Sequence, residues 1–110
     1  MKKYLFLFPI LLSSLYLQAQ IPAFQWAKRA GSLGHDYPSS VTTDNDGNVY
    51  VTGNFQGTVD FDPNAGVYNL TAPGIPADIF VLKLNANGNL VWARNMGGVG
   101  NDNGNFIAVD

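Results

Sequence analysis

The sequence contains neither cysteine nor glutamate among its 110 residues, and only 13% of its residues are charged. Without cysteine the chain cannot rest on a disulfide framework, so its stability must come from the burial of apolar surface. The same absence excludes a lipid-anchored lipoprotein, which needs a cysteine after its apolar leader. Sparse, mildly acidic charge without a basic patch argues against nucleic acid and against anionic membranes as partners.

Helical periodicity is also missing, and the one long apolar run lies at the amino terminus. Two lysines precede an apolar stretch from Tyr4 to Leu17, which is shorter than the roughly 18 apolar residues that a membrane helix needs. A positive start, an apolar centre and a small residue at Ala19 are typical of a secretory signal peptide. We therefore predict a signal peptide over residues 1–19, cleaved before Gln20, and a secreted or cell-surface protein without a membrane span after cleavage. The mature chain keeps four basic residues against eight Asp, so its net charge is near −4.

A segment near the start of the predicted mature chain recurs 66 positions later. Residues 25–44 correspond to residues 91–110, and six of these 20 paired positions are identical, where chance would give about one. The identical pairs are Trp26/Trp92, Ala27/Ala93, Gly31/Gly97, Gly34/Gly100, Asp36/Asp102 and Asp44/Asp110. A fixed period indicates a repeat architecture, in which each unit buries its faces against its neighbours.

Strand signals fill the interval between the two tryptophans. Four short segments are rich in β-branched or aromatic residues: 40–43, 48–53, 78–84 and 90–94. The third is almost continuously apolar, which predicts a strand covered on both faces. The pairs Asp46-Gly47 and Asn87-Gly88 predict hairpins with type I′ turns, whose two central residues both have positive φ. The longer connection between Gly53 and Asp78 leaves room for a small extra hairpin.

Four antiparallel strands that recur as a unit predict an all-β fold made of four-stranded antiparallel β-propeller blades. A β-sandwich is the competing fold, but sandwich strands do not recur as whole four-strand units. Several motifs, in the right order, resemble the SBBP family of β-propeller repeats: Trp26–Lys28, Gly31–Asp36, Asp46–Gly53, Val59–Pro63 and Asp78–Leu84. The resemblance implies a secreted or surface repeat protein of the Bacteroidetes type. The chain departs from the family pattern at Leu33, where Gly or Thr is usual, and at Pro38, where the second repeat copy has Gly104.

We expect residues 20–110 to be a partial β-propeller repeat region with a period of 66, from Trp26 to Trp92. It would hold a leading strand, about one whole blade and the start of the next blade. Repeat folds need about three or more units before neighbours cover each other's apolar faces. We therefore predict an amino-terminal fragment that needs further blades from the same chain or from another. By itself the region is expected to be poorly folded or self-associating.

One acidic segment has the spacing of a calcium loop. Asp60, Asp62 and Asn64 place oxygen-bearing side chains at alternate positions. A loop of the EF-hand kind also needs glycine at its sixth position and a bidentate acid at its twelfth, where this chain has Ala65 and Thr71. The pattern favours an Asx-Pro turn, so these three residues are candidate calcium ligands only, and we predict no metal site.

Other polar and aromatic residues also have a structural interpretation. His35 beside Asp36 lacks a nucleophile that it could activate, and the second repeat copy has Asn101 in place of the histidine. We predict no catalytic residue and no cofactor. Trp26 and Trp92 could stack sugars, but their equivalent spacing favours packing between neighbouring blades.

These features predict an exported, non-catalytic scaffold, or a platform that binds a protein or a glycan, at the cell surface or outside. The alternative from another class is the propeller portion of a secreted glycan-processing hydrolase. Such an enzyme needs two positioned acids, whereas the Asp residues here fall mostly in turn motifs. A calcium-stabilised repeat module is the third possibility.

Overall fold

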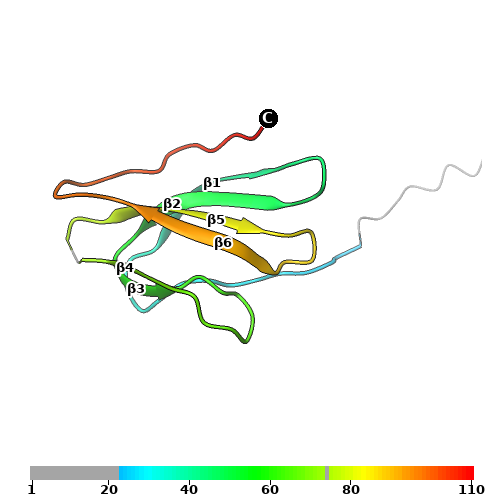
Figure 1. The fold of residues 1–110 in the computed structure, drawn as a ribbon, viewed down its shortest axis with the longest axis horizontal. Helices are drawn as coiled ribbons and strands as arrows, with labels where there is room; N and C mark the ends of the chain where they lie inside the picture. The colour runs from blue at the N-terminus through cyan, green and yellow to red at the C-terminus, as the bar shows by residue number, and fades with distance from the viewer. Residues whose placement is uncertain (1–22, 74) are drawn as a thin grey trace, which may run out of the picture.

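The computed structural model describes residues 23–73 and 75–110, so the predicted signal peptide lies outside the described residues. The described part of the chain is all-β and contains no helix long and apolar enough to cross a membrane. It has six strands: β1 (Tyr37–Thr43), β2 (Val49–Phe55), β3 (Gly57–Asp60), β4 (Asn69–Ala72), β5 (Asp78–Leu84) and β6 (Leu90–Met96). Four of them form one antiparallel sheet in the order β1-β2-β5-β6, and β3 pairs with β4 in a second sheet (Figure 1). The predicted four-stranded antiparallel unit is confirmed.

The main sheet has two unlike faces. Its core face carries the buried side chains of β2, β5 and β6: Phe55, Phe80, Leu82, Leu84 and Ala93. The opposite face, called the Trp92 face below, carries Tyr50, Thr52, Ile79, Val81, Lys83 and Trp92. Along β5 every second residue is buried and the residues between them are half-buried. The expectation that this strand is covered on both faces is therefore met fully on the core face and in part on the other.

The β3–β4 hairpin forms the extra hairpin expected between Gly53 and Asp78, and it covers one end of the core face (Figure 1). Phe55 is fully buried, with its ring edge-on to Phe61 at 5.3 Å and to Phe80 at 6.3 Å between ring centroids. The Tyr68 hydroxyl donates a hydrogen bond to the carbonyl of Ala93 at 3.3 Å. Aromatic packing holds the hairpin against β2 and β5, and this hydrogen bond holds it against β6.

The two tight turns of the main sheet are hairpins, as predicted, but they are not of type I′. Within the described residues only glycines have positive φ, so neither Asp46 nor Asn87 adopts the required conformation. Each turn instead has glycine alone in the left-handed region, at Gly47 (φ 80°) and Gly88 (φ 78°). The side chain at the first position of each turn, Asp44 or Asn85, explains why the turn is not of type I′. The Asp44 carboxylate accepts hydrogen bonds from the N–H groups of residues 46 and 48, which favours a type I turn before the glycine.

Two segments flank the strands on opposite sides of the main sheet. The leading segment (residues 23–36) lies below the sheet in Figure 1, with the hairpin, and the C-terminal segment (residues 97–110) lies above it. Neither contains a strand, so the predicted leading strand is wrong. A strand needs a hydrogen-bonded neighbour, and neither segment pairs with the outer edge of β1 or of β6.

Candidate functional site

The three candidate calcium ligands form consecutive turns. Asp60 Oδ1 accepts hydrogen bonds from the N–H groups of Asp62 (3.0 Å) and Tyr68 (2.8 Å), and Asp62 Oδ1 accepts one from the N–H of Asn64 (2.9 Å). The Tyr68 N–H, followed by the Asp62 N–H, holds the pKa of the Asp60 carboxyl below its ordinary value. Oδ1 of each aspartate thus already accepts backbone hydrogen bonds within its own turn. Within residues 23–73 and 75–110, no group of three or more His, Cys, Asp or Glu side chains is placed to hold a metal ion.

Asn64 links three parts of the molecule that are far apart in sequence. Its Oδ1 accepts a 2.6 Å hydrogen bond from Lys28 Nζ in the leading segment. Its Nδ2 donates to Oδ1 of Asn89, beside the β5–β6 turn, at 3.2 Å. Asn64 therefore holds the leading segment against the hairpin and against that turn. The sequence placed Asn64 with the two aspartates as a candidate ligand, whereas the structure gives it a separate contact.

A second acidic turn lies next to an aromatic cluster on the Trp92 face. Asp44 Oδ2 accepts hydrogen bonds from Asn48 Nδ2 (2.8 Å) and from the Tyr50 hydroxyl (3.1 Å). The Asn48 side chain is the main cause that lowers the pKa of Asp44. Lys83 Nζ lies 5.2 Å from the centre of the Tyr50 ring. The pKa of Lys83 is raised, mainly by its interaction with the Tyr50 hydroxyl. The Trp92 ring meets Tyr50 edge-on at 6.3 Å.

The repeated Gly-x-x-Gly-x-Asp loops have a structural explanation that the sequence analysis missed. Asp36 Oδ2 accepts a 2.7 Å hydrogen bond from the N–H of Ser32, and Asp102 Oδ2 accepts one of 2.9 Å from the N–H of Gly98. Both aspartates thus close their loop onto the residue four positions earlier. Their identity in the two repeat copies was the signal that could have revealed this role. His35 lies exposed, with Nδ1 3.1 Å from the Tyr37 hydroxyl and its ring stacked on that of Tyr37.

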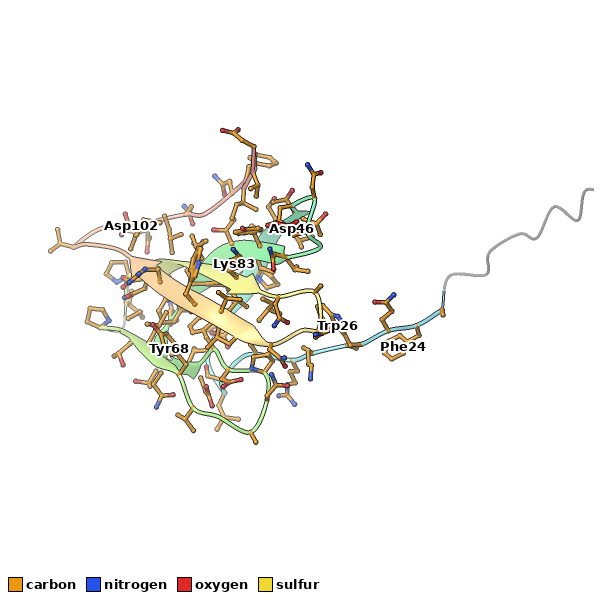
Figure 2. All side chains as sticks on the ribbon, turned by 45° about the vertical axis from the view of Figure 1, so that its right-hand side comes forward. Phe24, Trp26, Asp46, Tyr68, Lys83 and Asp102 are labelled. Atoms are coloured by element: carbon orange, nitrogen blue, oxygen red, sulfur yellow. The ribbon has the colours of Figure 1, made fainter. Side chains whose placement is uncertain are left out.

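Trp26 occupies a site on the β5–β6 turn, which we call the Trp seat (Asn85–Asn89). Its indole Nε1 donates a 2.8 Å hydrogen bond to the carbonyl of Ala86. The ring lies over Gly88, where a Cβ atom would come within 3.0 Å of Cδ2 of the indole. Figure 2 shows Trp26 beside this turn, at the point where the leading segment passes the main sheet. The half-buried Trp26 also packs against the core of this unit, and the packing between neighbouring blades stays a prediction.

A cavity of about 260 Å³ lies between the leading segment, the hairpin and the core face. Its walls are mainly apolar side chains, among them Trp26, Val51, Phe61 and Leu84. Asp36 is the one acid in its lining, and its Oδ1 is buried without a hydrogen-bond partner among the described residues. A single carboxylate cannot provide the acid and the second carboxylate that glycoside hydrolysis requires.

Comparisons with known proteins agree with this architecture. Residues 25–54 match the model of the SBBP family, described as a beta-propeller repeat. The chain is 31% identical over 102 residues to an uncharacterized WD repeat-containing protein of Acanthamoeba polyphaga mimivirus. That match covers 80% of this chain but only 7% of the length of the relative. No solved structure matches the chain significantly. The chain thus carries a β-propeller repeat, and the resemblance drawn from the motifs is confirmed over residues 25–54.

Proposed function

We propose that this chain belongs to an exported, non-catalytic repeat protein that acts as a protein-binding scaffold at the cell surface or outside. The observation that carries the proposal is the use of its carboxylates. Asp36, Asp44, Asp60 and Asp62 all accept hydrogen bonds from loop or turn N–H groups, and Asp102 does the same in the second repeat copy. Acids committed to turns hold loops in place, and a rigid β-scaffold that presents loops is suited to binding.

Two structural observations favour a protein partner over a glycan. Trp26 lies against the core with its N–H hydrogen-bonded, so its ring is not free to stack on a sugar. Trp92 packs edge-on against Tyr50 instead of standing free as a flat platform. The hydrolase alternative lacks a second acid in the cavity. Against the calcium alternative, Oδ1 of Asp60 and Oδ1 of Asp62 are each used by turn N–H groups.

Export is tested with a reporter enzyme that is active only outside the cytoplasm, fused after Asp110. The intact chain should give reporter activity, and a matched chain without residues 1–19 should give none. The mature protein should begin at Gln20 when its mass is measured. Equal reporter activity from both chains would refute the signal peptide and, with it, the extracellular location.

The kind of partner is tested by binding the purified chain to cells of the source organism. Treating the cells with protease should abolish binding, and oxidising their glycans with periodate should leave it unchanged. An unrelated exported protein of similar net charge serves as the control for non-specific adhesion. Binding lost to periodate but not to protease would refute the protein-binding proposal in favour of a glycan. Release of sugar from cell-surface glycans would refute the non-catalytic part.

A further inference from the structure

The side chain of Asn54, on β2, holds the start of the second repeat copy against the main sheet. Its Nδ2 donates hydrogen bonds to the carbonyl of Asp102 at 2.7 Å and to Oδ1 of Asn103 at 2.6 Å. Its Oδ1 accepts a hydrogen bond from the N–H of Gly104 at 2.9 Å. One amide group thus uses both of its polar atoms on three consecutive residues of the C-terminal segment. We call these three residues, Asp102–Gly104, the opening corner of the second copy.

The opening corner fits because its third residue has no side chain. Gly104 is buried, and a Cβ atom there would lie 2.6 Å from Oγ1 of Thr52 and 2.8 Å from Cγ2 of Ile79. The Thr52 hydroxyl is held in place, because it donates a 2.9 Å hydrogen bond to the carbonyl of Phe80. Gly104 is not among the glycines with positive φ, so close approach requires glycine here and backbone conformation does not. The contact therefore needs a backbone N–H and the absence of a Cβ atom at one position.

The first repeat copy has a corner that meets neither need. Its corresponding residues are Asp36, Tyr37 and Pro38. Proline has no N–H to donate, and it carries a ring where the site leaves no room for a Cβ atom. Tyr37 is 61% exposed and Pro38 is also exposed. The departure from the family pattern at Pro38 thus falls on the residue whose counterpart makes the closest contact with the sheet.

We propose that Asn54, Thr52 and Ile79 form a docking site that selects the Asp-x-Gly corner of a following β-propeller repeat and rejects the Asp-x-Pro corner of the first copy. Repeats then join through this contact in one order only. The second copy can follow the first, whereas the first copy cannot follow a repeat that carries the same site. A second molecule of this chain carries that site, so the leading corner of its neighbour cannot bind there.

This selection concerns contacts between repeats and goes beyond the proposed function, which concerns other proteins as partners. Either can fail without the other: export and cell binding test the function, and the dynamics of the purified chain test the docking site.

The experiment is residue-resolved amide hydrogen exchange, with the chain in the processed form that cells produce. Three N–H groups report on docking, those of Asp102, Gly104 and Ile107, which donate to the segment before β5, to β2 and to β1. The Gly98 N–H bonds to Asp102 within the loop, so it reports on the loop alone. The amides of the central strand β5 report on the sheet. A Gly104 N–H that exchanges in the unaltered chain as fast as an unstructured amide would overturn the docking site.

Asn54→Ala removes the three hydrogen bonds that hold the corner. The three docking amides should exchange about tenfold faster or more, while the loop amide and the amides of β5 keep their rates. Asn105→Ala is the matched control, because it removes an exposed asparagine side chain from the same segment and should change no rate by more than about twofold. Docking amides that exchange at the unaltered rate in Asn54→Ala would overturn the docking site.

Gly104→Pro gives the second copy the proline of the first and tests the selection. The two docking amides that remain should exchange about tenfold faster or more, since an N–H is lost and a ring is added. Asn103→Tyr, which introduces the other residue of the first corner, removes one exposed contact and should have an effect of about threefold or less. An unchanged rate in Gly104→Pro, or an equal effect from Asn103→Tyr, would overturn the selection.

Gly104→Ala guards against a proline variant that fails to fold, which loss of protection in β5 would reveal. It keeps the N–H and adds only the Cβ atom that meets Thr52 and Ile79. The docking amides should exchange about threefold faster or more, with β5 unchanged. Unchanged docking amides in Gly104→Ala would show that the site accepts a side chain and would overturn the selection for glycine.

Discussion

Replacing Gly88 with alanine should damage the molecule more than the same change at Gly47. Both glycines have φ near 80° in equivalent turns, so alanine costs about 1 to 2 kcal/mol of backbone strain at either position. At Gly47 the nearest atom to the new Cβ is a neighbouring methyl carbon, of Ala86, at 3.3 Å. At Gly88 the new Cβ would lie 3.0 Å from the indole ring of Trp26. The indole must then move and give up its 2.8 Å hydrogen bond to Ala86. We expect this displacement to add about 2 kcal/mol to the loss of stability.

The assay is urea unfolding at low protein concentration, followed by tryptophan fluorescence. A Trp92→Phe background leaves Trp26 as the single reporter. With a slope of about 1.5 kcal/mol per M, the extra 2 kcal/mol lowers the midpoint of Gly88→Ala by about 1.3 M relative to Gly47→Ala. The emission of Trp26 in folded Gly88→Ala should also shift to longer wavelength as the ring enters water. Equal midpoints for the two variants, with unchanged emission, would refute the Trp seat as described.

Three further outcomes are expected. Phe55→Ala removes a fully buried ring and should cost about 3 to 5 kcal/mol in the urea assay, while the exposed Phe106→Ala should cost under about 0.5 kcal/mol; a small effect at Phe55 would contradict the position of the core. The pKa values of Asp44 and Asp60 are lowered in the folded state, so their contribution to stability is present above the ordinary value of 3.8 and lost as the pH falls through the lowered values; unfolding midpoints that do not fall in acid would count against these hydrogen bonds. The melting temperature should be the same in excess calcium and in chelator, because Oδ1 of Asp60 and Oδ1 of Asp62 already accept backbone hydrogen bonds; a higher melting temperature in calcium would show that the loop binds the ion.

The strands could be predicted from sequence because each has a local signature. The expected strand over 78–84 is β5 at its exact bounds, and the other three main-sheet strands were placed to within three residues at each end. Alternation of apolar residues and the Asx-Gly pairs depend only on neighbours along the chain. The turn type was wrong because it depends on the side chains of Asp44 and Asn85, whose oxygens accept N–H groups across the turn.

The site could be predicted less well than the strands. The sequence grouped Asp60, Asp62 and Asn64 by spacing alone, yet Asn64 binds Lys28, 36 residues away. Spacing cannot show whether a carboxylate faces a cation or folds back onto its own backbone. The identity of Asp36 and Asp102 in the two repeat copies was visible, but their shared hydrogen bond to the start of the loop was not.

By itself the sequence determined that this chain is all-β and free of disulfides, because these properties follow from local pattern and composition, and it predicted a repeat period of 66 residues. Only the tertiary structure decided on which face of the sheet each tryptophan ring lies. Trp26 and Trp92 have nearly the same neighbours in sequence, yet one is seated over Gly88 and the other lies on the far side of the sheet against Tyr50. That difference depends on residues brought together from distant parts of the chain, since side chains alternate between faces and only the pairing of strands sets which face a ring meets.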